Sequence, residues 1–309
     1  MKNFRNIIFV LVVVIFVLQV VISSKDEKKE DGIKKPMVSL STFSLYDITK
    51  HIAKDKVDLV MILPFGVDAH SFEPTPKLMA KIQKSDLVIY SGAGLEPWVD
   101  RFDFKHKVVD MSKSVKLLKL DASKHHHTAT HNHHNLDPHY WLDVGNMMIA
   151  TEVIKNELIK ISPENKNFYE KNAKKYIDML KNLDAQYKQV LSQCKVDTIV
   201  VNHNAFSYMA KRYGFNVDSV SGFSPQAQPN AKNMMHLVHL VKEHNITTVF
   251  FENFANDKAI RSVASEAKVK VDSLQPIGNI TADEAKHKYT YEDIMKQNLK
   301  KLSKALKCR

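Results

Sequence analysis

The stretch "SPENKNFYEKNAKKYIDMLKNLDAQYKQVLSQC", residues 162–194, decides the fold of this chain. Its apolar residues recur at steps of three and four, which is the pattern of a helix with one buried face. These residues are Tyr169, Ala173, Tyr176, Leu180, Leu183, Tyr187 and Val190. Ser162 is the expected N-cap and Pro163 the first helical residue. Such a helix would be roughly 45 Å long, more than one domain needs, so we expect it to span two.

Short apolar runs alternate with helical periods on both sides of this helix. Before it, strands are expected over 37–42, 57–64, 86–92 and 107–112, with helices beginning near 44 and running over 76–84. After it, extended runs are expected over 196–203, 215–223, 246–252 and 269–274, with helices over 205–214, 230–245, 257–267 and 290–307. Short buried strands separated by helices are typical of parallel sheets covered on both faces. The sequence therefore predicts an α/β protein whose second half repeats the plan of the first.

The N-terminus carries a different signal. Lys2 and Arg5 precede an apolar run over 7–24, and a charged stretch follows it. The run is either a secretory signal peptide or an uncleaved anchor of about 18 residues, so the body of the protein is expected to be exported. The expected domains are a signal peptide or N-terminal anchor over 1–24, a charged spacer over 25–36, an N-terminal α/β lobe over 37–160 with a His-rich loop over 121–136, a linking helix over 161–194 and a C-terminal α/β lobe over 195–309.

Composition argues against several classes of function. The net charge is +11, but the lysines are spread along amphipathic helices rather than gathered in one groove, so no nucleic-acid partner is expected. With 8 glycines and no glycine-rich phosphate loop, the chain does not read as a Rossmann or P-loop protein. Cys194 and Cys308 would lie in an oxidising compartment, and the sequence leaves open whether they pair.

Three histidines share a setting that suits a binding site. His70 follows one expected strand and His203 ends another, while His139 lies in "DPHYW", where packed structure resumes after a polar stretch. Ligands bind at the carboxyl ends of strands in open α/β sheets, so the three imidazoles can converge in a cleft between lobes. Taken singly, each is more often an ordinary hydrogen-bonded residue. The remaining histidines outside the polar stretch are expected to be ordinary residues: His51, His106, His236, His239, His244 and His287.

The polar stretch itself holds six more histidines, scattered among Thr, Ala and Asn. They are His125, His126, His127, His131, His133 and His134. Their spacing is not that of a tetrahedral site, but a flexible run of imidazoles binds Zn²⁺ weakly and adaptably. We therefore expect this tract to be an auxiliary metal site that collects or senses zinc, while His139 belongs to a tighter one. The alternative is that the tract is an expression tag, although tags are placed at a terminus and are uninterrupted runs of histidine.

Five segments together resemble a known family. They are "ILPFGVDAHSFEPTP", "DLVIYSGAGLEPWVD", the His-rich insertion running into "DPHYWLDV", "VVNHNAFSYMAKRYGF" and "VFFENFAND". In this order they look like the ZnuA-like, zinc-binding subgroup (metal-binding cluster A-I) of the periplasmic solute-binding proteins that serve ABC importers. The resemblance covers the chain from about Met37 onward. It implies two α/β lobes with mainly parallel sheets, joined by one long rigid helix, with the metal in the cleft between them.

The same resemblance assigns the metal ligands. It places them at His70, His139 and His203, and implies that Zn²⁺ is the transported ligand. Manganese-selective relatives typically carry a glutamate at the position of His203, and three nitrogen ligands favour zinc on chemical grounds as well. Many zinc members have a carboxylate in a late turn where this chain has Gly278. A water is therefore the expected fourth ligand, and the alternatives are Asp283, Glu252 and Asp68.

The resemblance also implies the setting in which the protein works. We expect a periplasmic monomer, not an enzyme, whose partners are the permease and the ATPase of a zinc importer. The alternatives are a carrier of manganese or another divalent metal, a metal-binding adhesin and a zinc hydrolase. No HExxH helix or GxSxG elbow supports the hydrolase.

Overall fold

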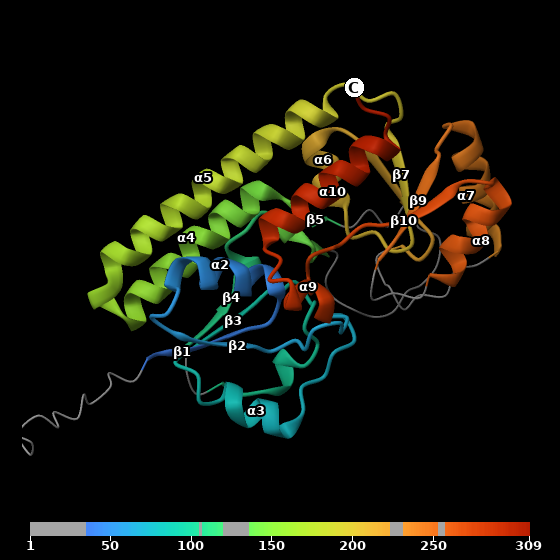
Figure 1. Ribbon diagram of the computed structural model, residues 1–309. Helices are drawn as coiled ribbons and strands as arrows, with labels where there is room; N and C mark the ends of the chain where they lie inside the picture. The colour runs from blue at the N-terminus through green and yellow to red at the C-terminus, as the bar shows by residue number, and fades with distance from the viewer. Residues whose placement is uncertain (1–34, 105–106, 120–135, 223–230, 253–256) are drawn as a thin grey trace, which may run out of the picture. The chain divides into compact units, whose positions relative to one another are not determined.

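Two parallel sheets, one from each half of the chain, form the framework of the protein (Figure 1). The structure is a computed structural model and describes residues 35–104, 107–119, 136–222, 231–252 and 257–309. The expected signal peptide or anchor, most of the charged spacer and the six clustered histidines lie outside these residues. Pro36–Arg309 form one compact unit, separate from Met1–Lys35. Within the described part of the chain, every helix is too short or too polar to cross a bilayer.

The first sheet has four strands in the order β2-β1-β3-β4, all parallel. They are β1 (Met37–Leu40), β2 (Asp58–Met61), β3 (Leu87–Tyr90) and β4 (Lys107–Asp110). Helices α2 (Phe43–Ala53) and α3 (Pro76–Ile82) lie on opposite sides of it (Figure 1). On β3, Leu87 and Ile89 join the main core, whereas Val88 packs in a smaller core with residues of α3. Burial on both faces explains why these strands read as continuous apolar runs.

The second sheet repeats this plan, with strand order β10-β9-β7-β8, again all parallel. Its strands are β7 (Thr198–Val201), β8 (Asn216–Ser219), β9 (Thr248–Phe251) and β10 (Lys270–Ser273). Figure 1 shows α6 (Ser207–Tyr213) and α10 (Tyr291–Ala305) on one side, and α7 (Ala231–Glu243) and α8 (Lys258–Ala267) on the other. The predicted α/β class with mainly parallel sheets is confirmed.

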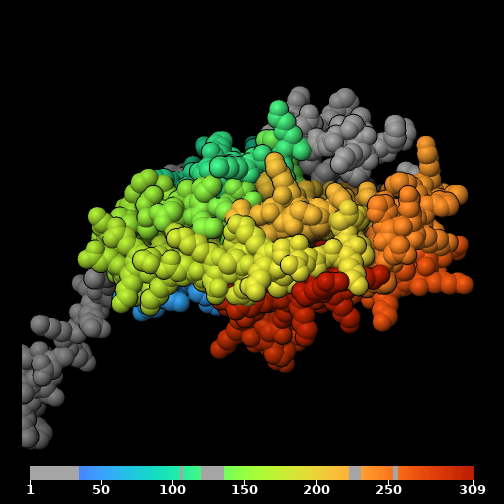
Figure 2. Space-filling view, turned by 90° about the horizontal axis from the view of Figure 1, so that it is seen from above, coloured from blue at the N-terminus to red at the C-terminus, as the bar shows by residue number. Residues whose placement is uncertain are grey.

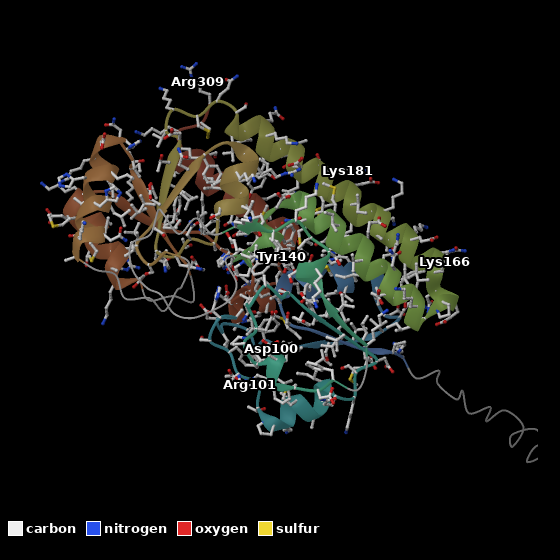
Figure 3. All side chains as sticks on the ribbon, turned by 180° about the vertical axis from the view of Figure 1, so that it is seen from behind. Asp100, Arg101, Tyr140, Lys166, Lys181 and Arg309 are labelled. Atoms are coloured by element: carbon white, nitrogen blue, oxygen red, sulfur yellow. A yellow bond between two sulfur atoms is a disulfide. The ribbon has the colours of Figure 1, made fainter. Side chains whose placement is uncertain are left out.

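Helix α4 (Val144–Ile161) packs in the first half against α2, and helix α5 (Lys166–Leu191) runs from the first half to the second. Helix α5 has 26 residues and is therefore about 39 Å long. It packs against α2 and α4 in the first half and against α6 and α10 in the second. Its buried face contains the predicted periodic residues Tyr169, Ala173, Tyr176, Leu180, Leu183 and Tyr187. Figure 2 shows α5 along one face of the molecule, and Figure 3 shows Lys166 and Lys181 on its outer side. The predicted long helix is confirmed.

The start of this helix differs from the prediction. A 3₁₀ turn, η5 (Pro163–Asn165), precedes α5; Ser162 and Pro163 hold the expected N-cap and first positions in this turn, whereas the N-cap of α5 itself is Asn165. The Ser162 hydroxyl donates a hydrogen bond to the Glu164 carboxylate instead of accepting one from the helix backbone. A local side-chain contact has thus replaced the expected cap.

Shorter elements complete the described chain. These are the 3₁₀ turns η1 (Val99–Arg101), η2 (Met111–Lys113) and η4 (Tyr140–Leu142), the antiparallel pair β5 (Leu118–Lys119) and β6 (Leu136–Asp137), and helix α9 (Ala282–Lys286). Cys194, just after α5, forms a disulfide with Cys308 at the C-terminus. The pairing that the sequence left open therefore exists, and it ties the end of the long helix to the end of the chain.

Candidate metal centre

Three imidazoles meet at one point in the fold. One ring nitrogen from each of His70, His139 and His203 lies within 4.8 Å of the others, and the Nε2 atoms of His70 and His139 are 3.1 Å apart. His70 lies between β2 and α3, His139 between β6 and η4, and His203 just beyond β7. His139 and His203 are buried, and His70 is half-buried. The structure thus brings together the three histidines that the sequence singled out.

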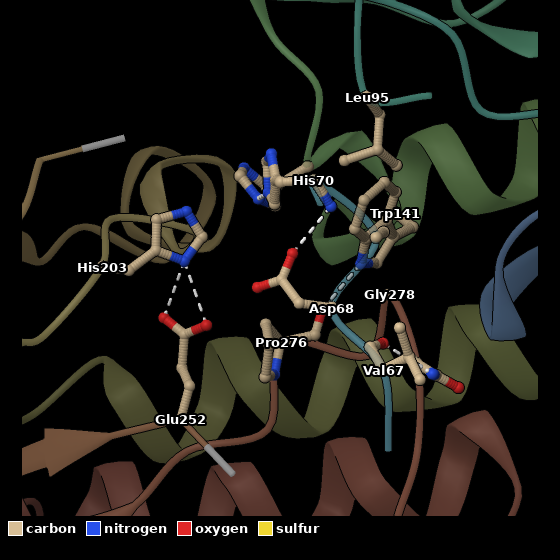
Figure 4. Close-up of a pocket in the computed structure, with 12 residues that line it drawn as sticks. Val67, Asp68, His70, Leu95, Trp141, His203, Glu252, Pro276 and Gly278 are labelled. Atoms are coloured by element: carbon tan, nitrogen blue, oxygen red, sulfur yellow. Dashed lines mark hydrogen bonds and ion pairs between the residues drawn. The ribbon is translucent and has the colours of Figure 1, made fainter. Parts of the chain in front are cut away.

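In two of these rings, the Nδ1 atom is hydrogen-bonded to a carboxylate. His139 Nδ1 lies 2.8 Å from Asp137 Oδ1, and His203 Nδ1 lies 2.9 and 3.0 Å from the two oxygens of Glu252. Because an ionised carboxylate only accepts hydrogen bonds, each Nδ1 carries the proton. The Nε2 atom of each ring therefore keeps its lone pair for a ligand. Figure 4 shows Glu252 behind His203 in this arrangement.

The strand register explains how Glu252 reaches His203. Strands β7 and β9 are neighbours in the second sheet, with Val201 opposite Phe250. His203 lies two residues after Val201 and Glu252 two residues after Phe250. The two side chains therefore lie side by side just beyond the ends of neighbouring strands. Asn202 Oδ1 accepts the backbone N–H of Glu252 at 3.0 Å and fixes the strand end that carries it.

The sequence D-x-H occurs twice and has the same local geometry each time. Asp137 Oδ1 accepts the backbone N–H of His139 at 2.9 Å, and Asp68 Oδ1 accepts that of His70 at 2.7 Å. The two aspartates then differ: Asp137 also binds the ring of its histidine, whereas the second carboxylate oxygen of Asp68 points toward His203 (Figure 4). Each aspartate fixes the backbone of the turn that presents its histidine.

Electrostatics set His70 apart from His203. Burial, together with the neighbouring His139 and His203, holds the pKa of His70 well below its ordinary value of 6.5. Burial lowers the pKa of His203, but the carboxylates of Glu252, Asp68 and Asp137 together outweigh it, so the net pKa of His203 is raised. Burial raises the pKa of Asp68. His70 is therefore neutral at physiological pH, and His203 takes up a proton more readily than His70 does.

The three rings line a small pocket of about 30 Å³. Its wall includes Trp141, whose Nε1 donates to the carbonyl of Pro276 at 2.7 Å. A Cβ built on Gly278 would lie 3.1 Å from the Trp141 ring. The indole therefore occupies the space that a side chain at position 278 would need. Position 278 itself contributes no carboxylate to the pocket, in keeping with the departure seen in the sequence.

The expected fourth-ligand candidates occupy different places. Asp68 and Glu252 line the pocket, but both oxygens of Glu252 face His203 Nδ1 rather than the Nε2 side. Asp283 lies in α9, its side chain is 81% exposed, and it does not belong to the described pocket lining. Neither Asp68 nor Glu252 joins the group of nitrogens within 4.8 Å in the described part of the chain.

Sequence reasoning missed the roles of Asp137 and of Glu252 as the partners of the imidazoles. The repeated D-x-H pattern was a usable signal for Asp137. Glu252 gave none, because strand adjacency cannot be read from periodicity. The six clustered histidines fall outside the described residues.

Comparisons with known proteins agree with this geometry. The family model "ZnuA: Zinc-uptake complex component A periplasmic" matches residues 38–305. The high-affinity zinc uptake system protein ZnuA of Bacillus subtilis is 34% identical over 295 residues, which cover 92% of this chain and 91% of that protein. The zinc-binding lipoprotein AdcA of Streptococcus pneumoniae is 33% identical over 290 residues, 91% of this chain but only 57% of the lipoprotein.

Solved structures show the same fold. The Zn(II)-bound ZnuA-like domain of S. pneumoniae AdcA superposes with a TM-score of 0.73 at 31% identity, covering 88% of this chain and 99% of that domain. The laminin-binding protein Lmb of Streptococcus agalactiae, described as bifunctional with adhesin and metal-transporting activity, gives a TM-score of 0.78 at 30% identity, with coverage of 88% and 99%.

Proposed function

Because the chain belongs to the ZnuA family of periplasmic zinc-uptake components, we propose that it captures Zn²⁺ outside the cytoplasm and delivers it to a membrane permease. The observation that carries this proposal is the convergence of His70, His139 and His203 within 4.8 Å. Three imidazole nitrogens suit Zn²⁺, whereas Mn²⁺ prefers oxygen ligands. The ion is the cargo of this site, and the three histidines are its proposed ligands.

Asp137 and Glu252 are proposed to prepare two of the ligands. Each holds a proton on Nδ1 and so directs the lone pair of Nε2 into the pocket. A carboxylate behind a ligating histidine also makes the imidazole a stronger donor. Their charges offset part of the charge of the bound cation, which favours retention in a buried pocket.

We propose that a water completes the coordination shell. A pocket needs at least about 10–15 Å³ of water-accessible space for each water-sized occupant, so the observed 30 Å³ suits one ion and one small ligand. The Asp68 carboxylate, whose second oxygen faces this space (Figure 4), would accept a hydrogen bond from that water.

The wider architecture fits a carrier. We propose that residues 37–160 and 195–309 act as two lobes on the linking helix over 161–194, and that zinc is released when their arrangement changes in contact with a permease and its ATPase. The protein is proposed to be an exported monomer without catalytic activity, in which residues 1–24 are either a signal peptide that directs export or an uncleaved anchor that keeps the exported protein at the membrane. The His-rich tract is proposed to collect zinc for the tight site.

Metal analysis tests the assignment of cargo and ligands. The exported chain, purified without a tag, should contain about one tightly held zinc and should keep it in competition with excess manganese. His139→Ala should lose that ion, whereas the matched variant His287→Ala, at a side chain that is 58% exposed, should retain it. Preferential loading with manganese, or equal zinc retention by both variants, would contradict the proposal.

A tract deletion tests the division of labour. Removing residues 121–135 should lower the total zinc bound at high concentration and leave the affinity of the tight site unchanged. An affinity loss as large as that of His139→Ala would show that the tract belongs to the tight site.

An adhesin function is the second candidate, because Lmb combines both activities. Zinc-dependent adhesion of intact cells to laminin, abolished by deletion of this protein alone, would favour it. Zinc-limited growth of the same deletion strain would favour transport.

A further inference from the structure

Helix α6 carries a tyrosine, Tyr208, that forms hydrogen bonds with residues in the first half of the chain. The helix begins at Ser207, four residues beyond His203. The hydroxyl of Tyr208 donates to the carbonyl of Asp137 at 2.6 Å and accepts the backbone N–H of Leu118 at 2.9 Å. Tyr208 is only 2% exposed, so these hydrogen bonds are shielded from water. One side chain therefore joins the segment after His203 to the segment before His139.

The two groups bound by this hydroxyl face each other in the hairpin. Leu118 pairs with Asp137 across the antiparallel strands β5 and β6. The phenol therefore bridges both strands at the base from which residues 120–135 depart and to which they return. A shift of β6 at this point would move Asp137, whose carboxylate holds both the backbone and the ring of His139.

A second contact from α6 holds the chain beyond His139. Arg212 Nη1 lies 3.2 Å from Asp143 Oδ1, and its Nε and Nη2 bind the two oxygens of Asp184 on α5 at 2.7 and 2.9 Å. Asp143 is the N-cap of α4. Helix α6 thus contacts the His139 segment on both sides of the ring, through the neutral hydroxyl of Tyr208 at Asp137 and through the guanidinium of Arg212 at Asp143.

We infer that Tyr208 is a positioning residue of the metal site, whose hydroxyl sets His139 relative to His203 through Asp137. This inference rests on the proposed zinc function. Without the hydroxyl, the Leu118 N–H and the Asp137 carbonyl lose a partner, the hairpin base loosens, and the two Nε2 atoms no longer hold one fixed separation. A loss of affinity follows, because a preformed site gives up less entropy on binding.

The test compares Tyr208→Phe with Tyr187→Phe. Tyr187 also donates from a fully buried hydroxyl to a backbone carbonyl, that of Met295, at 2.6 Å, and it lies outside the described residues that line the pocket. Both variants should show similar losses of thermal stability without metal. Only Tyr208→Phe should weaken zinc binding, by about tenfold, the lower end of the range for supporting residues around metal ligands. The Co²⁺-loaded Tyr208→Phe protein should also show an altered visible spectrum.

Each outcome bears on the inference. Unchanged zinc affinity and an unchanged Co²⁺ spectrum in Tyr208→Phe would overturn it, as would an equal affinity loss in Tyr187→Phe. If Tyr208→Phe does not fold, NMR of the zinc-loaded wild type gives a second readout: a slowly exchanging Tyr208 hydroxyl proton close to the Leu118 amide is expected, and its absence refutes the inference. A wild-type protein that binds no zinc would overturn the proposed function as well, whereas failure of the tyrosine alone leaves wild-type binding intact.

Discussion

His139 and His203 differ from His70 in how the fold holds them. The first two are buried, and each has a carboxylate on Nδ1. His70 is half-buried and lies in a connecting segment that is held at its start by Asn279, which donates to the carbonyls of Pro64 and Val67 at 2.6 and 2.8 Å. The difference indicates that two of the proposed ligands are fixed in position before metal binds, whereas the third comes from a separately anchored loop. Four predictions would break or sharpen this contrast.

Removal of a ligand should have the largest effect. His203→Ala should weaken zinc binding by more than about 100-fold, beyond the range for supporting residues, and should destabilise the metal-free protein, because Glu252 is left buried without its Nδ1 donor. His70→Ala should weaken binding to a similar degree but leave the stability of the metal-free protein nearly unchanged. Chelator competition and thermal unfolding measure the two quantities. Equal destabilisation by both substitutions would remove the contrast.

Loss of a supporting carboxylate should come next. Glu252→Gln and Asp137→Asn should each weaken zinc binding by about 10- to 100-fold, because a neutral amide is a weaker partner for the Nδ1 proton. Asp283→Asn, at an exposed site on α9, is the matched control and should bind as the wild type does. If the control and the two variants bind zinc alike, the carboxylates have no role in the affinity.

Acidity should weaken binding in a particular order. A ligating imidazole must be neutral, and the raised pKa of His203 means that its Nε2 takes a proton before that of His70 as the pH falls. The pKa of His70 is well below 6.5, so that ring competes for protons only at lower pH. Zinc affinity should therefore begin to fall at or above pH 6.5, approaching tenfold per pH unit while one proton competes. Titration calorimetry at several pH values would contradict this if affinity held constant to well below pH 6.5.

Loss of the disulfide should affect zinc least. Cys194→Ser with Cys308→Ser removes a link that closes a span of 114 residues, which should lower the free energy of unfolding by about 2–5 kcal/mol. The pocket should keep its zinc affinity, because both cysteines lie outside its described lining. Denaturant unfolding and chelator competition on the same samples check the pair of expectations. A zinc affinity that falls with the stability would mean that the site depends on the far end of α5.

The sequence predicted the elements better than their pairing. The periodicity of α5 and the apolar runs of strands such as β3 and β7 depend on local pattern, so they could be read directly. The rule that ligands gather where parallel strands end applies to His70 and His203, which follow β2 and β7, whereas His139 follows the antiparallel strand β6 and its place depended on the family resemblance. Glu252 could not be assigned, because its place behind His203 depends on β9 lying beside β7. The Cys194–Cys308 bond depended in the same way on where α10 ends relative to α5.

The hairpin of β5 and β6 bears on how zinc would be supplied to the pocket. Residues 120–135 connect β5 to β6, and β6 ends two residues before His139. In the sequence, His134 and His125 precede His139 by five and fourteen positions. Fully stretched chain over those intervals spans at most about 18 and 50 Å. If the tract binds zinc as proposed, donors tethered within such reach would act at an effective concentration on the order of millimolar. Passage of an ion from the tract to the pocket would then be an intramolecular step, equally fast in dilute and in crowded protein.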